Sequence, residues 1–289
     1  MGSVQRVSVI RAMTRSHLAG AIEVINSDAL PGQPWCTTGM LLQATKVRDA
    51  GGVLRPATPV ERPRSFVAIG DRLVGAADVT RTADGVGSIK WLHAREDPTV
   101  IGELLDHALD RLAGCDVIEA FAGGGIGPIV SGLPAVRSTT QEALVARGFA
   151  ATPAGRYLYR PMSFAPPALA DPPRIEVTAH ARRHQLTIPG LAEATVSVLA
   201  PGHGLLQWIE VDSSHRGGGL GAHLLNACLR YLHRLGVRHV IGFLDDHNLS
   251  ADDGHGRIGA HMICTRAGFV TGAQLATYSK VRVGEWGSH

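Results

Sequence analysis

The sequence lacks the features of a disulfide-stabilised or membrane-embedded protein. Its 289 residues include four scattered cysteines, none of them in a Cys-x-x-Cys pair. In a chain of this size that pattern indicates free thiols in a reducing compartment. There is no run of 18 apolar residues, and no charged amino terminus is followed by an apolar stretch. We therefore expect neither a membrane span nor a secretion signal, and we expect a cytoplasmic location.

Concentrated charge and metal-ligand spacing are also missing. The net charge is only +3, whereas a nucleic-acid-binding domain needs a clustered basic face. The chain has fourteen histidines, but pairs such as His255 and His261 lack a zinc-site spacing and no cysteine pair completes a site. We therefore expect no nucleic acid and no metal. With 45% apolar and 18% charged residues, the composition is that of a globular protein long enough for about two domains.

The most informative stretch is a glycine-rich loop between a predicted strand, Gly204–Val211, and an amphipathic helix that ends near Leu235. The loop reads Arg216-Gly217-Gly218-Gly219-Leu220-Gly221. Without Cβ atoms, its backbone can approach a bulky anion closely. The first turn of the helix behind it offers unpaired N–H groups and the positive end of the helix dipole. Arg216 adds a charge and donor geometry that suit phosphate oxygens.

Three kinds of phosphate-binding loop place glycines between a strand and a helix. A P-loop needs Gly-Lys-Ser/Thr after its glycines, and a dinucleotide fingerprint needs Gly-x-Gly-x-x-Gly; the loop at Gly217–Gly221 has neither. It does have Arg-x-x-Gly-x-Gly directly after a strand. That pattern resembles the acyl-CoA loop of the GNAT superfamily of N-acyltransferases. Asn248-Leu249-Ser250-Ala251 and Gly268-Phe269 further resemble steps of the same family.

The resemblance implies a mixed α/β fold in which two parallel strands, here Gly204–Val211 and Val237–Leu244, separate and admit acetyl-CoA or another acyl-CoA. The pantetheine would pair with the backbone of the first strand, and the loop would hold the pyrophosphate. The contacts that it implies are Ile209, Val211, Arg216, Gly217, Gly218, Gly219, Leu220, Gly221, Ala222 and Asn248.

Direct attack by an amine requires a base that takes up its proton. Glu210 is a candidate by its place near the strand end, and it could equally be an ordinary exposed carboxylate. The end of the neighbouring strand offers Asp245, Asp246 and His247, which could also be a polar strand terminus, while His203 is a weaker candidate.

The leaving thiolate needs a proton or a hydrogen bond. The family usually places a tyrosine five residues before the phenylalanine of Gly-Phe, and Cys264 stands at that position. A thiol with a reference pKa of about 8.5 could serve, but free cysteines are more often small buried apolar residues. Tyr278 on the last predicted strand is a fallback.

The amino-terminal half predicts the order β-α-α-β-β-β-α-β-α-β, which resembles a complete GNAT domain. Where its cofactor loop should fall, the sequence reads Ala94-Arg95-Glu96-Asp97-Pro98. It has no glycine, and its two acids would repel a pyrophosphate, so we interpret this loop as degenerate. A second glycine-rich stretch, 122–128, is interpreted as a flexible loop because no amphipathic helix follows it.

These patterns predict a degenerate GNAT-like domain at residues 1–162, a proline-rich linker at 163–173 and an active GNAT domain at 174–289. Only about 30 residues separate the start of the first predicted strand of the second domain, Arg174–Thr178, from the start of the third, Gly204–Val211. That is too short for the two helices that usually line the acceptor side, so we infer that the first domain or a partner chain supplies part of that wall.

The expected activity is transfer of an acetyl group from acetyl-CoA to an amine of a small molecule. The tandem arrangement is similar to mycothiol synthase and to antibiotic-cluster acyltransferases, and this analogy favours a small acceptor. A homodimer is kept as an option. The alternatives are a non-catalytic, regulatory acyl-CoA-binding module and, less favoured, a nicotinamide-dependent enzyme.

Overall fold

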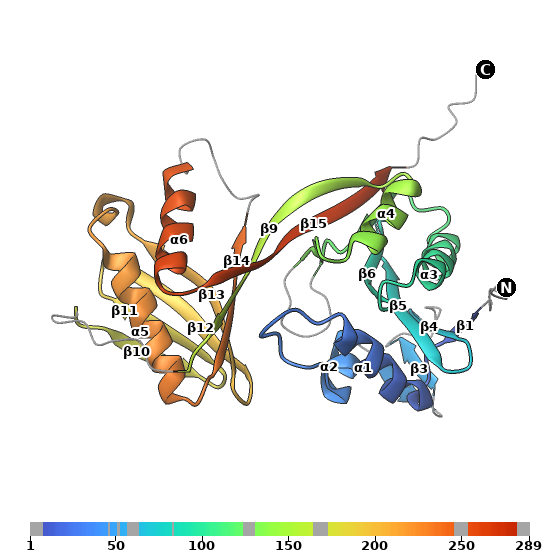
Figure 1. Ribbon diagram of the computed structural model, residues 1–289, viewed down its shortest axis with the longest axis horizontal. Helices are drawn as coiled ribbons and strands as arrows, with labels where there is room; N and C mark the ends of the chain where they lie inside the picture. The colour runs from blue at the N-terminus through green and yellow to red at the C-terminus, as the bar shows by residue number, and fades with distance from the viewer. Residues whose placement is uncertain are drawn as a thin grey trace, which may run out of the picture. The chain divides into compact units, whose positions relative to one another are not determined.

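The computed structural model describes residues 8–45, 47–50, 53–56, 64–82, 84–123, 131–163, 173–245 and 254–281 (Figure 1). It divides into two compact units. Unit 1 comprises residues 1–29, 35–154 and 275–289, and unit 2 comprises residues 30–34 and 155–274. Each unit is a sheet with helices packed on it, which confirms the mixed α/β class.

Unit 1 is built on a sheet with the strand order β1-β4-β5-β6-β7-β15, in which β8 also pairs with β15. The strands are β1 (Val9–Ala12), β4 (Ser65–Ile69), β5 (Leu73–Arg81), β6 (Gly87–His93), β7 (Val117–Ala120), β8 (Leu133–Pro134) and β15 (Val270–Val281). A separate hairpin is formed by β2 (Val47–Ala50) and β3 (Val53–Pro56). The pairs are antiparallel except for β6 with β7.

Two hydrophobic cores belong to unit 1. One lies under α1 (Leu18–Ser27), which follows the 3₁₀ turn η1 (Arg15–His17), and α2 (Thr38–Thr45). The other lies under α3 (Pro98–Arg111) and α4 (Ser138–Ala146). The sequence places Ile101, Leu104, Leu105, Ala108 and Leu112 at helical spacing. All five are buried in α3 or at its C-cap, because a 3.6-residue period puts them on one face.

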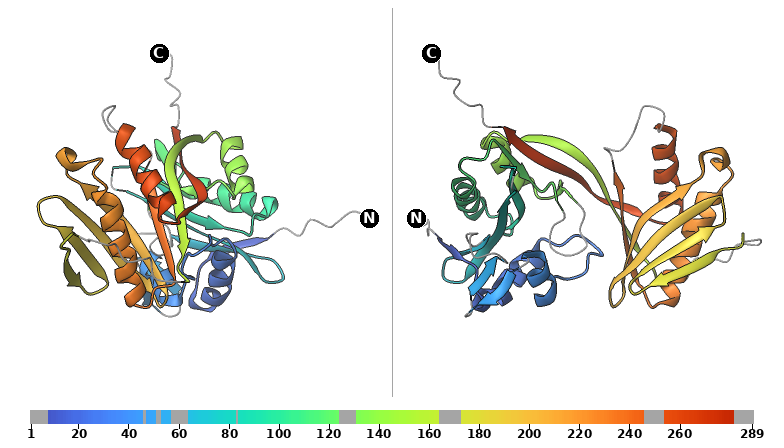
Figure 2. Two further views of the ribbon diagram at one scale, coloured as in Figure 1. Left: turned by 60° about the vertical axis from the view of Figure 1, so that its left-hand side comes forward. Right: turned by 180° about the vertical axis from the view of Figure 1, so that it is seen from behind.

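Unit 2 has the strand order β9-β14-β13-β12-β11-β10. Its elements are β9 (Ala150–Pro161), β10 (Glu176–His180), β11 (Arg183–Ile188), β12 (Ala192–Ala200), β13 (His203–Val211), the 3₁₀ turn η2 (Ser213–His215), α5 (Leu220–Arg234), β14 (His239–Asp245) and α6 (Gly254–Arg266). Helices α5 and α6 contact each other and share one core with the sheet (Figure 2). The sequence predicts that Leu220, Leu224, Cys228, Leu232 and Leu235 face the sheet. Leu224, Cys228 and Leu232 are buried there and Leu220 packs against the core, whereas Leu235, the C-cap residue, is 45% exposed.

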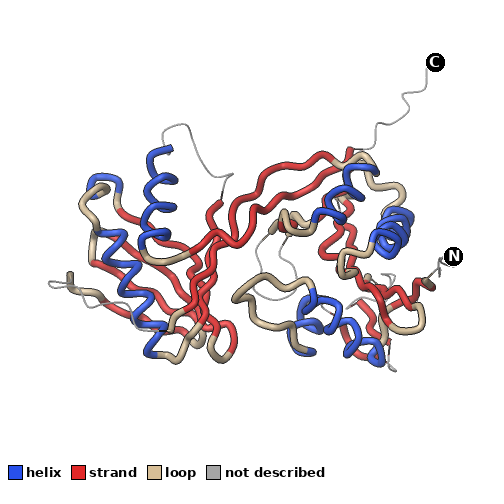
Figure 3. The backbone as a smooth tube through the Cα atoms, in the orientation of Figure 1, coloured by secondary structure: helices blue, strands red, loops and turns tan. Residues whose placement is uncertain are grey.

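The strands that close the two sheets differ from the sequence prediction. We expected Tyr157–Arg160 to close the first domain and Gln274–Val281 to close the second. In the structure, β9 pairs with β14 from Gly155 to Pro161, within unit 2. The last residues of β15, from Leu275 onward, pair with β7 and β8 in unit 1. Figure 3 shows β9 and β15 as long strands, and both contribute residues to the two units.

Three further differences are local. The helix predicted over Thr38–Asp49 stops at Thr45, and β2 follows it. Strand β11 was not predicted, although His184, Leu186 and Ile188 alternate as buried residues. The sequence predicts a helix over Ile258–Ala267, whereas α6 begins at Gly254. In residues 173–219 the structure has strands and one 3₁₀ turn but no α-helix, which agrees with the inference that unit 2 lacks two helices.

The proline-rich linker lies almost wholly outside the described residues. No described helix is both long enough and apolar enough to cross a membrane.

Candidate functional site

The two parallel strands of unit 2 separate part-way along their length. Pairing of β13 with β14 runs from His203 opposite His239 to Leu206 opposite Gly242, and no later pair is found in the described residues. Strand β13 nevertheless continues to Val211, held by β12 on its other side. Beyond Leu206 the edge of β13 therefore offers backbone groups to an extended ligand, as an exposed sheet edge does. Ile209 and Val211 lie in this part of the strand.

The glycine-rich loop follows the separated end of β13. Gly217 and Gly219 have φ values of +84° and +81°, a conformation that glycine adopts without steric cost. A Cβ at either position would meet nothing within 4 Å, so the glycines satisfy the backbone conformation and leave open space beside the loop. The side chain of Arg216 is exposed, and its Nε donates to the carbonyl oxygen of Val211 at 3.2 Å.

Helix α5 begins directly after this loop with an uncapped amino terminus. Its N-cap residue is Gly219, and no side chain in the described part of the chain caps it. The N–H groups of the first turn, at Leu220, Gly221 and Ala222, have no carbonyl inside the helix to donate to. They point out of the helix at its positive end, which is the arrangement that binds phosphate groups.

The turn that joins β13 to the loop is fixed by Asp212. Its carboxylate accepts from the backbone N–H of Ser214 at 2.9 Å and from the Ser214 hydroxyl, and the His215 ring lies 3.4 Å away. These contacts, the Ser214 hydroxyl first, lower the pKa of Asp212. The carboxylate is therefore ionised at neutral pH and holds the turn.

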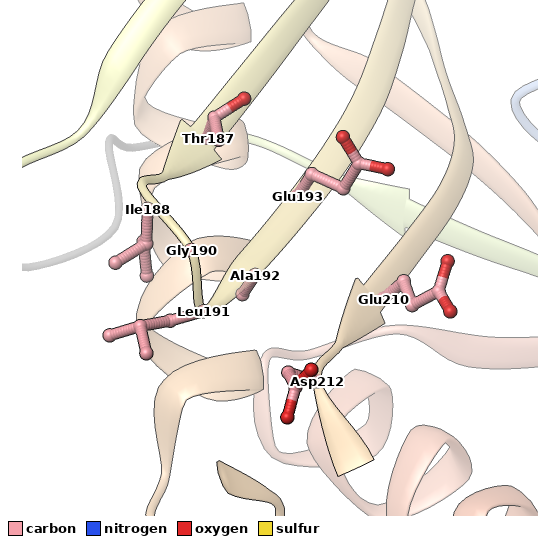
Figure 4. Close-up of a pocket in the computed structure, with 8 residues that line it drawn as sticks. All are labelled: Thr187, Ile188, Gly190, Leu191, Ala192, Glu193, Glu210 and Asp212. Carbon is pink, nitrogen blue, oxygen red and sulfur yellow. The ribbon is translucent and has the colours of Figure 1, made fainter. Parts of the chain in front are cut away.

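Beside this turn lies a hollow of about 340 Å³, drawn in Figure 4. Its wall includes Thr187, Glu193, Glu210 and Asp212. Glu193 and Glu210 are direct cross-strand partners on β12 and β13, and Gln185 donates from Nε2 to Glu193 at 2.8 Å. Because Ile209 and Val211 pack into the core under α5, alternation turns the exposed Glu210 to the opposite face of the sheet.

Cys264, the residue at the expected tyrosine position, lies in the core between α5, α6 and the sheet, and only 3% of it is exposed. Burial raises the pKa of its thiol to about 11. This environment favours the packing role that the sequence left open. Asp246, His247 and Asn248 lie outside the described residues.

The two weaker candidates lie elsewhere. Tyr278, the fallback acid, is buried in the core of unit 1 and pairs with Ala120 on β7. It was expected in the second domain because β15 was expected to close that sheet. His203 stacks on His239 with ring centres 5.2 Å apart, and its Nδ1 lies 3.0 Å from the carbonyl oxygen of Pro201. Among the described residues no group of three or more His, Cys, Asp or Glu side chains is arranged to hold a metal.

The comparisons with known proteins point to one family. Residues 177–259 match the sequence profile of the Acetyltransferase (GNAT) family. This part of the chain is similar to a GNAT domain. The matched range contains the separated strands, the glycine-rich loop and α5. No curated protein sequence matches the chain.

Solved structures extend the likeness to the whole chain. A GCN5-related N-acetyltransferase from Sphaerobacter thermophilus superimposes with a TM-score of 0.62 at 12% identity and 95% coverage of both chains. A tandem GNAT protein from the clavulanic acid biosynthesis pathway gives 0.59 at 14% identity, covering 96% of this chain and 98% of the other. A GNAT acetyltransferase from Colwellia psychrerythraea gives 0.56 at 10% identity, covering 95% and 100%. At these identities the likeness establishes the fold, that of two GNAT-like domains in tandem.

Unit 1 repeats the strand geometry of unit 2. Pairing of β6 with β7 ends at Ile89 opposite Ala120, yet β6 continues to His93. A bulge lies at Lys90, because Trp91 pairs with Asp78 and Ile89 pairs with Val79.

A bulge lies at the corresponding place on β13, at Gln207, since Trp208 pairs with Thr195 and Leu206 with Val196. Aligning the two bulges matches Trp91 with Trp208 and His93 with Glu210. The match is also visible in the sequence, where Lys-Trp-Leu-His at residues 90–93 corresponds to Gln-Trp-Ile-Glu at residues 207–210. The predictions from sequence did not include this similarity.

His93, the counterpart of Glu210, belongs to a buried polar network in unit 1. Its Nδ1 lies 3.0 Å from the carboxylate of Asp28, and Arg137 lies 3.5 Å from the same carboxylate. Burial lowers the pKa of His93 against the opposing effect of the Asp28 hydrogen bond, so the imidazole is neutral at neutral pH. Trp91, on the same face of β6, has a buried Nε1 with no partner among the described residues.

In unit 1 the first turn of the helix that follows the parted strand is capped, whereas in unit 2 it is open. Asp97 caps α3, and its Oδ1 accepts from the N–H groups of Thr99 and Val100 at 3.0 and 3.1 Å. Pro98 has no N–H to offer. Glu96 accepts from the backbone N–H of Thr140 at 3.0 Å, in the first turn of α4. Carboxylates of the chain thus occupy the helix ends that a phosphate would need, in agreement with the prediction of a degenerate loop.

Proposed function

We propose that unit 2 transfers an acetyl group from acetyl-CoA to the amine of a small molecule by direct attack. The observation that carries this proposal is the parting of β13 from β14 immediately before an uncapped helix. A gap between strands without the open helix end would hold only an extended chain. The two together suit a ligand with an amide-bearing arm and a diphosphate, which is the chemistry of coenzyme A.

The binding residues in this proposal follow from the geometry. Backbone groups of Ile209 and Val211, on the part of β13 that has left β14, would pair with the pantetheine amides. The N–H groups from Gly217 to Ala222 would surround the diphosphate, and Arg216 would add its charge at the exposed edge. Asn248, which follows β14 by three residues in the sequence, is a further proposed contact.

In the proposed reaction the nitrogen of a neutral amine forms a bond to the thioester carbonyl carbon, and the carbon–sulfur bond then breaks. The amine proton passes to a carboxylate, directly or through water, and coenzyme A leaves as a thiolate that gains a proton. We assign Glu210 as the base, because its side chain is exposed on the face opposite α5 and lines the hollow. Asp246 is the alternative base. Cys264 is the proposed proton donor by its position in the sequence.

The acceptor is proposed to be a small molecule. The hollow of about 340 Å³ beside Glu210 is the size of a small-ligand site. A tandem GNAT protein with a similar fold comes from the clavulanic acid biosynthesis pathway, whose product is a small molecule.

A second candidate function is acyl-CoA binding without turnover. The burial of Cys264 favours it, because a thiol packed in the core is poorly placed to give a proton to coenzyme A.

The two functions are separated by the variant Glu210→Gln, which keeps size and polarity but removes the base. A transferase should lose roughly 100-fold or more in kcat, measured as coenzyme A release with a panel of amines. Its acetyl-CoA affinity, measured by calorimetry, should not change. The matched control is Glu193→Gln, the cross-strand partner, which should keep most of the rate. Saturable acetyl-CoA binding by the wild type with no release for any amine would instead establish the binding module.

A further inference from the structure

The face of the unit 2 sheet that looks away from α5 and α6 has a distinctive composition. On β14, Val240 and Leu244 belong to the core under the helices, so Phe243 points to the other face. By the same alternation Trp208 of β13 lies on that face, because its neighbour Ile209 packs into the core. On β9 Leu158 belongs to this core, which places Tyr157 and Tyr159 on the far face as well.

Four aromatic side chains therefore share one face of three adjacent strands, β9, β14 and β13, in a chain with only 5% aromatic residues. Phe243 is the first residue of β14 beyond its last pair with β13. Its ring lies edge-on to that of Tyr157, with centres 5.6 Å apart. Phe243 and Trp208 are each partly exposed. An apolar, flat surface thus begins where the strands separate.

A short segment from the beginning of the chain lies on this surface. Residues Leu30–Pro34, here called the strap, belong to unit 2. The Tyr157 hydroxyl donates to the carbonyl oxygen of Pro31 at 2.6 Å. Gly32 has φ +74°, and a Cβ there would lie 2.2 Å from the ring of Tyr159.

The strap is a closed turn. The N–H of Leu30 donates to the Gln33 side chain at 2.8 Å, and the N–H of Gln33 donates to the carbonyl oxygen of Leu30 at 3.1 Å. It therefore presents a fixed shape to the two tyrosines, at the place where unit 2 has no helix of its own among its described residues.

We propose that the strap, held by the fully buried Tyr157, and the partly exposed rings of Phe243 and Trp208 form the acceptor wall of unit 2. The acceptor they fit is a primary amine carried on an aromatic or flat apolar body. Aromatic side chains bind such a body through large contact area and edge-to-face packing. An ammonium group is also attracted to ring faces, and Glu210, on the same sheet face, is placed to take up its proton. This inference rests on the proposed acetyl transfer.

The test compares phenethylamine with ethanolamine, two primary amines that differ in the body attached to the amine. We expect the wild-type kcat/KM for phenethylamine to exceed that for ethanolamine by about tenfold or more, the equivalent of one buried ring contact.

In Gly32→Val the new side chain collides with Tyr159 and displaces the strap. We expect KM for phenethylamine to rise about tenfold, with acetyl-CoA affinity unchanged in calorimetry. Gly202→Val is the matched control, because Gly202 has φ +77° and nothing within 4 Å of a Cβ. It carries the same backbone strain without the collision. Tyr157→Phe, which removes only the hydrogen bond to Pro31, should raise KM by a smaller factor and keeps the test available if Gly32→Val fails to fold.

The outcomes distinguish this inference from the function on which it rests. Equal kcat/KM values for the two amines, or no transfer to either one by a chain that binds acetyl-CoA, overturn the acceptor class. A Gly32→Val or Tyr157→Phe variant indistinguishable from Gly202→Val overturns the role of the strap. Failure of the wild type to bind acetyl-CoA overturns the proposed function itself.

Discussion

Strand β6 of unit 1 and strand β13 of unit 2 each part from a parallel neighbour before they end, and a helix follows each of them. The amino termini of these two helices differ in capping and in charge. In unit 2, α5 starts after Gly219, no described side chain caps its first turn, and Arg216 precedes it by four residues. In unit 1, α3 starts after Asp97, whose carboxylate takes the N–H groups of Thr99 and Val100. One helix end is open and flanked by a positive charge, while the other carries its own negative charge.

This contrast shows that topology alone does not make an anion site. Each helix has the positive end of its dipole at its amino terminus, and each follows a strand that has parted from its parallel neighbour. What differs is whether the chain satisfies the first-turn donors itself. An internal carboxylate stabilises the helix at all times, whereas an open end gains that stabilisation only when an anion binds.

The largest expected effect comes from giving α5 the internal acid that α3 has. Gly219→Glu places a carboxylate at the open helix end and fills the space beside the loop. We expect acetyl-CoA affinity to fall by at least about 100-fold, since repulsion and lost contacts of a few kcal/mol act together. Isothermal calorimetry measures the affinity, and circular dichroism checks that the fold is intact.

Gly219→Gln separates charge from size in that experiment. It has the same length and the same backbone strain at φ +81°, so its affinity should lie between those of the wild type and Gly219→Glu. If Gly219→Glu binds acetyl-CoA as the wild type does, the open helix end is not the diphosphate site.

A second large effect is expected in the closed loop. The carboxylate of Glu96 accepts from Arg137 at 2.9 Å, and the Arg137 side chain is only 5% exposed. Glu96→Ala leaves that guanidinium without one of its two carboxylate partners and should lower the free energy of unfolding by about 3 kcal/mol. Urea denaturation followed by circular dichroism measures it.

Acetyl-CoA affinity should be unchanged in Glu96→Ala, because the open loop is in the other unit. The exposed Glu142→Ala on α4 is the control and should cost less than about 0.5 kcal/mol. An equal loss in the two variants would mean that the Glu96 network does not hold the closed loop.

Much of the fold could be predicted from sequence because its signals are local. The buried face of α5 repeats at helical spacing, and the turn glycine Gly236 ends that helix. The closing strands could not be assigned in this way. Tyr157–Arg160 and Gln274–Val281 were both predicted as strands, but which sheet each one completes depends on pairing partners far away in the sequence. Strand β11 was missed because its alternation falls in a short stretch between two turns.

The same distinction between local and long-range signals applies to the candidate site. The loop from Arg216 to Gly221 and the capping acid Asp97 are contiguous motifs, so the sequence was sufficient to propose their opposite roles. The contact between Tyr157 and Pro31 joins residues 126 positions apart, and no local pattern indicates it. The burial of Cys264 likewise depends on how α6 packs, which its position before Gly268-Phe269 does not reveal.

The smallest expected effect tests whether removing the acid is enough to open the closed end. Asp97→Ala removes the cap of α3 and should cost about 1 kcal/mol of stability in urea denaturation. Asp97→Asn, whose amide oxygen can still cap, should cost less. Neither variant should gain a second acetyl-CoA site in calorimetry, because Pro98 supplies no N–H and Glu96 stays beside the loop. A second site in Asp97→Ala would show that one carboxylate alone separates the two units, and the contrast would then rest on Asp97 instead of on the whole loop.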